Sequence, residues 1–184
     1  MTGVPQGGPL SVVLSNVYLD KLDKELEQRG LRFTRYADDT MIFTKSEMAA
    51  NRVMKSITDW IERKLFLKVN ATKTKVVRPT RSKYLGFTFL NHGGEWKVKP
   101  TTEKKKRLKQ KLSEYLKRNK AIARPLAETI KRVNEIVRGW INYFRIGMMK
   151  TFMKEFGAWL RHKIRVIVIK QWKMPKRIYR NLCY

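Results

Sequence analysis

The apolar residues of this 184-residue chain follow two patterns that meet near Pro100. Residues 1–100 combine helical spacing with short runs of β-prone residues, whereas residues 101–184 keep helical spacing throughout. A chain of this length has room for one sizeable core or two small ones. We therefore expect an α+β fold in which a mixed part, residues 1–100, is followed by a helical part, residues 101–184.

The first part is predicted to hold two helices and a hairpin. Apolar spacing predicts a helix over about residues 10–29, and Ser46 is suited to cap a second one. Between them, the runs 31–36 and 40–44 predict a β-hairpin with Ala37-Asp38-Asp39 at its tip. Further short strands are expected over residues 67–69, 74–77 and 83–89, followed by a turn over residues 91–94.

The second part is predicted to be helical. Apolar residues recur at helical spacing over residues 108–116 and again over residues 126–144. A third helix is expected to hold the apolar residues from Phe152 to Ile167. The stretch Val166–Ile169 would suit a strand equally well, because β-branched residues favour extended structure.

Basic residues far outnumber acidic ones. The chain carries 42 Lys and Arg against 15 Asp and Glu, a formal charge of +27, which is far more than solubility requires. Residues 1–100 hold 18 basic and 10 acidic side chains, and residues 101–184 hold 24 and 5. A polyanionic partner is therefore expected, above all for the second part, and a nucleic acid meets that requirement.

An anionic membrane surface is the alternative partner for so basic a chain. The basic helices are not paired with a lipid-facing Trp/Leu stripe, and Val166–Ile169, the longest β-branched apolar stretch, is too short to span a bilayer. Cys183 is the single cysteine, so no internal disulfide forms, and His92 and His162 give no zinc-ligand spacing. We expect a soluble cytoplasmic protein that binds no membrane.

Asp38 and Asp39 are the residues that point most directly to chemistry. Two adjacent carboxylates at a hairpin tip can hold Mg²⁺ beside a substrate phosphate, because Mg²⁺ takes few protein ligands and completes its shell with water and phosphate oxygens. Aspartate is also a common turn residue, and such a pair by itself indicates an ordinary turn more often than a metal site. The neighbouring motifs change that balance.

Several motifs occur along the chain in a fixed order. The first part contains VPQGGPLS over residues 4–11, RYADD over 35–39, LKVNATKT over 67–74 and YLGF over 84–87. The second part contains RGWINYF over residues 138–144, WLRHKIR over 159–165 and KQWK over 170–173. Together they resemble the later palm motifs and the maturase-specific thumb of bacterial group II intron reverse transcriptases. The resemblance covers nearly the whole chain.

This resemblance implies a fold and an activity. The fold would be a partial polymerase palm over residues 1–100, with a β-hairpin and short antiparallel strands packed on two helices, followed by an α-helical thumb over residues 101–184. The activity would be RNA-directed DNA synthesis by two-metal nucleotidyl transfer, with Mg²⁺ held by Asp38 and Asp39. The implied partners are group II intron RNA, an RNA template with its DNA primer, and deoxynucleotides.

The resemblance also implies roles for residues beside the aspartates. Lys73 would act near the leaving pyrophosphate, although a solvated lysine is an open alternative. Leu85 and Gly86 would grip the primer end, and a plain buried hairpin contact is the alternative. Residues that would contact the nucleotide or template are Pro5, Gln6, Gly7, Tyr36, Ala37 and Asn70.

Basic residues of the second part are the candidate RNA contacts, since they lie among aromatic residues that can stack on bases. By helical spacing, Trp140, Phe144 and Trp159 are more readily explained as core residues, which leaves the cations as the contacts. The candidates are Lys104, Lys105, Lys106, Arg107, Lys109, Lys111, Arg138, Arg145, Arg161, Lys163 and Arg165.

Two hypotheses remain open for the function. In the family, a further metal-binding aspartate lies in a strand before the Pro-Gln-Gly segment, with the fingers before it. The two-metal site is therefore expected to be incomplete in these 184 residues, and the chain to be inactive by itself unless a separate chain supplies those parts. The alternative is a non-catalytic RNA-binding protein that assists folding and splicing of the intron.

Overall fold

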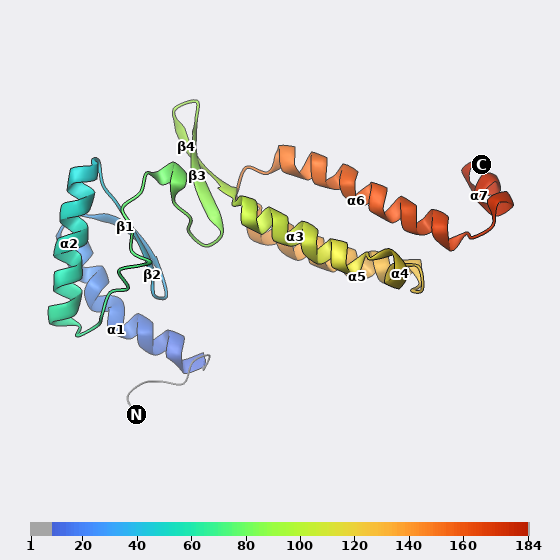
Figure 1. Ribbon diagram of the computed structural model, residues 1–184. Coiled ribbons are helices and arrows are strands. Elements are labelled where there is room, and N and C mark those ends of the chain that lie inside the picture. Colours follow the sequence, from blue (N-terminus) through green and yellow to red (C-terminus); the bar gives the residue numbers. More distant parts are fainter. Residues whose placement is uncertain (1–8, 184) are drawn as a thin grey trace. The chain divides into compact units, whose positions relative to one another are not determined.

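The computed structural model describes residues 9–183, which form an α+β fold (Figure 1). These residues divide into two compact units between Val77 and Arg78. None of the described helices is both long enough and apolar enough to cross a bilayer.

The first unit contains the predicted helices and hairpin. Helix α1 (Pro9–Gln28) leads to the strands β1 (Arg32–Tyr36) and β2 (Asp39–Phe43), and helix α2 (Glu47–Lys64) follows. The two strands pair antiparallel, with Arg32 opposite Phe43 at one end of the ladder. The Ser46 side chain accepts a hydrogen bond from the backbone N–H of Ala49, so the predicted N-cap of α2 is confirmed.

The core of the first unit lies where α1 and α2 meet the hairpin. Leu22 and Leu26 of α1 are buried together with Ile57 of α2 and Leu65, which caps α2. Side chains of both strands pack against this cluster. The helical spacing of these apolar residues therefore identified the buried face of both helices correctly.

The strands predicted over residues 67–69 and 74–77 are wrong, because this segment is irregular. Phe66 begins it with a φ of 53°, which turns the chain out of extended structure. The Asn70 side chain then accepts the backbone N–H groups of Thr72 and Lys73 at 3.1 and 3.2 Å. A side chain that captures local N–H groups in this way competes with a strand ladder for them, so a turn forms instead.

The second unit joins a hairpin to five helices, among residues 78–183. A short 3-10 helix, η1 (Pro79–Arg81), precedes β3 (Phe87–His92) and β4 (Glu95–Pro100). The two strands pair antiparallel around Gly93 and Gly94, within the predicted turn. The helices that follow are α3 (Thr102–Tyr115), α4 (Arg118–Ala121), α5 (Leu126–Phe144), α6 (Lys150–Gln171) and α7 (Pro175–Leu182). The sequence did not predict β4, α4 or α7, and the strand expected over 83–89 begins only at Phe87.

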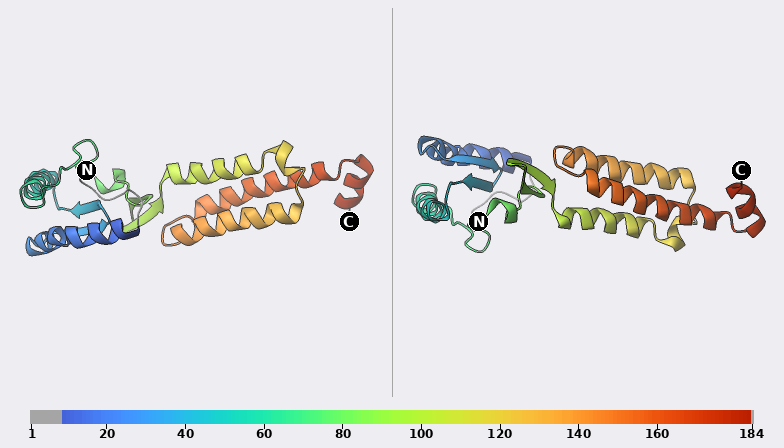
Figure 2. Two further views of the ribbon diagram at one scale, coloured as in Figure 1. Left: turned by 90° about the horizontal axis from the view of Figure 1, so that it is seen from below. Right: turned by 90° about the horizontal axis from the view of Figure 1, so that it is seen from above.

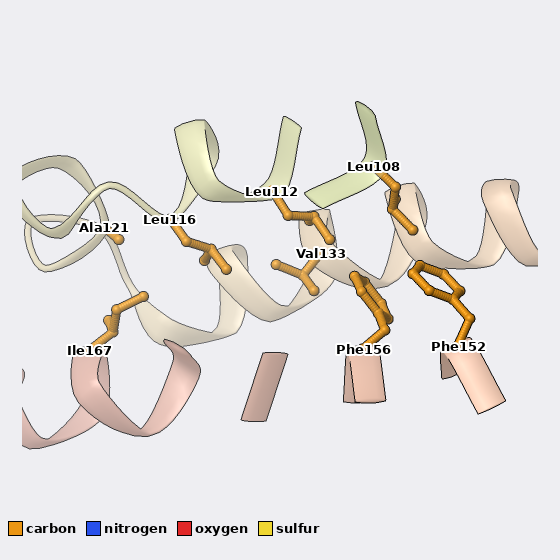
Figure 3. Close-up of a cluster of buried hydrophobic side chains, with 8 residues drawn as sticks. All are labelled: Leu108, Leu112, Leu116, Ala121, Val133, Phe152, Phe156 and Ile167. Carbon is orange, nitrogen blue, oxygen red and sulfur yellow. The ribbon is translucent and has the colours of Figure 1, made fainter. Parts of the chain in front are cut away.

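Helices α3, α5 and α6 form a three-helix bundle (Figure 2). Its core contains Leu108 and Leu112 of α3, Val133 of α5, and Phe156 of α6, with other apolar side chains (Figure 3). Residues 166–169 belong to α6, and Ile167 is buried in the same core. The helical alternative for this stretch is therefore the correct one.

The β3–β4 hairpin belongs to the unit that contains the bundle. The ring of Phe87 lies 5.0 Å from that of Phe144 at the end of α5, measured between centroids. The backbone N–H of Met148 donates to the carbonyl of Val98 at 2.7 Å, and Pro100 is buried. The change of pattern at Pro100 is thus a change of secondary structure inside a single compact unit.

Candidate functional site

The two candidate metal ligands lie at the β1–β2 turn. Tyr36 pairs with Asp39, so the turn itself consists of Ala37 and Asp38, and Asp39 is the first residue of β2. Ala37 has a φ of 53°, a left-handed conformation that a two-residue hairpin turn demands. Asp38 and Asp39 are both exposed, as is Tyr36. The hairpin therefore presents two adjacent carboxylates to solvent.

Hydrogen bonds of the Arg35 side chain connect this turn to α1. Its Nε donates to Oδ1 of Asp23 on α1 at 2.8 Å, and its second terminal nitrogen pairs with the other oxygen of that carboxylate. The remaining terminal nitrogen donates to Oδ1 of Asn16 at 2.8 Å and to the carbonyl of Ala37 at 2.9 Å. Only 10% of the Arg35 side chain is exposed. The guanidinium thus connects α1 to the backbone of the turn that carries the aspartates.

Sequence reasoning missed this network. Arg35 lies within the RYADD motif, but the motif alone does not say what the guanidinium binds. Asp23, which lies on α1, was not singled out from the sequence. An available signal is that Asn16 and Asp23 are seven residues apart on one helix, which places both side chains on the same face.

The Asp38–Asp39 pair fits part of an Mg²⁺ site. One or two carboxylates commonly suffice for Mg²⁺ when substrate phosphates and water complete the octahedral shell. Within residues 9–183, no three His, Cys, Asp or Glu side chains come together as a metal-binding group. For Mg²⁺, the described residues would supply only these two carboxylates, and the other ligands would come from substrate, water or residues outside the described range.

Asn70 and Lys73 share a second turn of the same unit. Besides the two backbone N–H groups, Oδ1 of Asn70 accepts the Thr72 hydroxyl at 2.7 Å, and the Asn70 carbonyl accepts the N–H of Lys73 and of Thr74. Lys73 is exposed on this turn. The motif thus forms a hydrogen-bonded turn that carries a solvent-facing lysine.

Leu85 and Gly86 form a tight turn in the second unit. Tyr84 and Phe87 exchange both backbone hydrogen bonds, at 3.0 and 2.8 Å, and the two residues between them have φ values of 49° and 83°. Positive φ at both central positions is the geometry of a type I′ turn. A glycine suits the second position, because L-residues rarely adopt such a conformation.

Helices of the bundle hold this turn in place. The hydroxyl of Tyr143 on α5 donates to the carbonyl of Leu85 at 3.0 Å, and the backbone N–H of Thr101 donates to the carbonyl of Gly86 at 2.9 Å. A Cβ added at Gly86 would come within 2.9 Å of Cε of Lys104. The Lys104 stem therefore packs directly over the turn. Tyr143 is a further residue that sequence reasoning did not single out as a contact of Leu85.

The candidate RNA-binding residues of the second unit differ in exposure. Lys104, Lys105 and Lys109 are half-buried on α3. The others are exposed: Lys106, Arg107, Lys111, Arg138, Arg145, Arg161, Lys163 and Arg165. Of the aromatic residues expected in the core, Phe144 is buried. Trp140 and Trp159 are half-buried and pack against the core of the bundle.

Two of the half-buried lysines lie over aromatic rings of α6. The ammonium of Lys105 is 5.2 Å from the centroid of Phe152, and that of Lys109 is 5.9 Å from the centroid of Trp159. Burial lowers the pKa of Lys105 below its ordinary value, and the nearby charge of Lys99 adds to the effect. These two cations are engaged in packing, so the exposed residues are the better placed for RNA.

The predicted site residues are divided between the two units, apart from three that lie outside the described residues. The structure brings Tyr36, Ala37, Asp38 and Asp39 onto one turn and Asn70 with Lys73 onto another, both in the first unit. Leu85, Gly86 and the basic candidates belong to the second unit. Pro5, Gln6 and Gly7 lie outside the described residues.

Two family models match the chain, in the order that the motifs suggest. The model for reverse transcriptase (RNA-dependent DNA polymerase) matches residues 1–89, and the model for the group II intron, maturase-specific domain matches residues 105–183. A comparison with curated proteins finds no match. The first match contains the Asp38–Asp39 turn, and the second contains α5, α6 and most of α3. The chain therefore belongs to the group II intron reverse transcriptase/maturase family.

Proposed function

We propose that this chain contributes to RNA-directed DNA synthesis, with Asp38 and Asp39 as ligands of catalytic Mg²⁺ and the basic helices as the holder of RNA. The observation that carries the proposal is the exposed aspartate pair on a turn whose backbone Arg35 fixes. A turn whose backbone is already held in place loses less conformational freedom when its carboxylates bind a metal, which favours binding. We further propose that residues 1–100 act as part of the palm and residues 101–184 as the thumb.

In this proposal the chemistry is the attack of a primer 3′-hydroxyl on the α-phosphate of a deoxynucleotide. Bound Mg²⁺ would supply charge stabilisation for the attacking and leaving oxygens. Lys73, exposed on its own turn, would place a positive charge near the departing pyrophosphate. Pro5, Gln6 and Gly7, with Tyr36, Ala37 and Asn70, would contact the nucleotide or template, and Leu85 and Gly86 would support the primer end.

The metal assignment predicts cation binding that depends on the aspartate pair. Mn²⁺, detected by electron paramagnetic resonance, is the probe. Because each carboxylate supplies charge and oxygen ligands, Asp38→Asn is expected to weaken Mn²⁺ binding by about tenfold, and Asp39→Asn similarly. Asp59→Asn is the matched control, since Asp59 is an aspartate of the same unit that pairs with Arg63 on α2. Equal Mn²⁺ affinity in all three variants would contradict the assignment.

The RNA assignment predicts binding that salt weakens. Arg161, Lys163 and Arg165 lie exposed on α6, and contacts to phosphate release counterions from RNA. The affinity for a structured RNA is expected to fall by about tenfold or more between 50 and 200 mM salt, as measured by fluorescence anisotropy.

Neutralising these three cations with glutamine is expected to weaken binding and to flatten the salt dependence. The control replaces three exposed basic residues of α2, Arg52, Lys55 and Lys64, with glutamine, which changes the net charge equally. The assignment fails if the two triple variants bind RNA alike.

A further inference from the structure

A groove runs between α3 and α5 of the bundle, with a volume of about 530 Å³. We name it the α3–α5 groove. Leu108, Ile136 and Phe144 contribute apolar walls. The residues that matter most for its chemistry are Lys104, Arg107 and Lys111 of α3 with Gly139, Trp140 and Tyr143 of α5.

The α3 wall of the groove is a line of positive charge. Lys104, Arg107 and Lys111 are spaced at i, i+3 and i+7, which places them on one face of the helix. On the opposite wall, Arg132 donates to Glu135 at 2.8 Å, so the acidic residue of the groove is already neutralised by a neighbour on its own helix. The groove therefore carries a net positive charge that suits a polyanion.

Gly139 belongs to the α5 wall of the groove and leaves open space there. It lies in the interior of a 19-residue helix, where glycine is less favourable than any residue except proline. A Cβ built at this position would meet no atom within 4 Å, so packing inside the protein does not require glycine here. The missing side chain leaves space in the groove, and space beside exposed backbone is what allows a ligand chain to approach closely.

Two residues that line the groove also contact the Leu85–Gly86 turn. Tyr143 lines the groove and donates its hydroxyl to the Leu85 carbonyl, while the Lys104 stem covers Gly86. Tyr143 stacks on Phe87, with ring centroids 6.0 Å apart, but it is still 55% exposed, so part of its ring is accessible to a nucleobase. The groove thus joins a line of cations to an aromatic surface and to a rigid backbone turn.

We propose that the α3–α5 groove is a binding site for one strand of RNA, whose ribose–phosphate backbone passes over Gly139. The phosphates pair with Arg107 and Lys111, and a base stacks on Tyr143 beside the Leu85–Gly86 turn. This proposal rests on the proposed RNA-binding function and specifies where on the basic unit one strand lies.

The test fills the groove without removing a charge. Gly139→Leu places a side chain in the space above Gly139 and is expected to weaken binding of a fluorescein-labelled RNA by about tenfold, because the backbone can no longer approach. The melting temperature is expected to stay the same or rise, since leucine favours helix more than glycine does. Asn134→Leu is the matched control, an exposed α5 position outside the groove, and its RNA affinity is expected to stay unchanged.

A charge pair provides a second measurement should Gly139→Leu fail to fold. The double variant Arg107→Gln/Lys111→Gln is expected to weaken RNA binding more than Lys117→Gln/Lys120→Gln, which removes two exposed cations of the same unit outside the groove. Unchanged RNA affinity in a folded Gly139→Leu chain, or equal loss in the two double variants, would overturn the groove assignment. If the unmodified chain fails to bind RNA in any salt, the proposed function itself fails.

Discussion

Replacing Phe156 with alanine is expected to lower the free energy of unfolding of the second unit by about 3–5 kcal/mol. Phe156 is 1% exposed and lies at the centre of the bundle core, with its ring 5.5 Å from that of Phe152 and 5.7 Å from that of Trp159. Three helices surround it, so the backbone cannot collapse easily to fill the cavity. A loss of this size is a large share of the stability of a small domain.

Hydrogen exchange by mass spectrometry separates this effect from the other unit. Protection of amides in α3, α5 and α6 is expected to fall in Phe156→Ala, while amides of β1, β2 and α2 keep theirs. Ile146→Ala is the control, because this residue is 74% exposed and its truncation removes little buried surface. Similar exchange in the two variants would show that Phe156 does not anchor the core.

Replacing Asp23 with alanine is expected to lower the free energy of unfolding of the first unit by about 2–3 kcal/mol. Removing one partner of a buried ion pair costs about 3–5 kcal/mol, and both the 25% exposure of Asp23 and the other hydrogen bonds of Arg35, to Asn16 and Ala37, reduce that figure. The Arg35 guanidinium has little solvent to replace its lost partner, since it is only 10% exposed. The β1–β2 turn is expected to loosen with it, because Arg35 also holds the Ala37 carbonyl.

The same helix offers a control for this substitution. Asp20 pairs with Lys24, but both side chains are more than half exposed, so Asp20→Ala is expected to change stability by less than about 1 kcal/mol. Hydrogen exchange of the β1–β2 amides should rise in Asp23→Ala and remain unchanged in Asp20→Ala. Mn²⁺ binding at Asp38 and Asp39 should weaken in Asp23→Ala alone. If Asp23→Ala leaves both measurements as they are in Asp20→Ala, the Arg35 network does not position the turn.

Periodicity predicted the long helices because each of them buries one regular face, whereas the first hairpin was predicted from its β-prone runs. In α2, for example, Val53, Ile57 and Ile61 recur at helical spacing, and all three face the core of the first unit. Strand β4 was missed, because Glu95–Pro100 carries two lysines and ends in proline. It forms because β3 pairs with it across a two-glycine turn, and the propensities of residues 95–100 alone do not predict that pairing.

Residues of the candidate site could be predicted from the sequence only where a motif falls on a predicted turn. The RYADD motif identified Asp38 and Asp39, and the hairpin places both in solvent as expected. The partners of Arg35 and of the Leu85 carbonyl were not predictable, since Asp23 is 12 residues from Arg35 and Tyr143 is 58 residues from Leu85. Such pairs depend on how separate elements pack, and a single sequence does not record that packing.

The hydrogen bond between Tyr143 and the Leu85 carbonyl limits where the chain can be divided into pieces that fold by themselves. The two family matches end at residue 89 and begin at residue 105, yet residues from both sides build one compact unit. Cutting the chain between the matches would either split the β3–β4 hairpin or separate it from the helices on which it packs. We expect exchange of segments between relatives to be better tolerated at Val77–Arg78, the boundary between the two compact units, because this junction keeps the Leu85 turn and Tyr143 in the same piece.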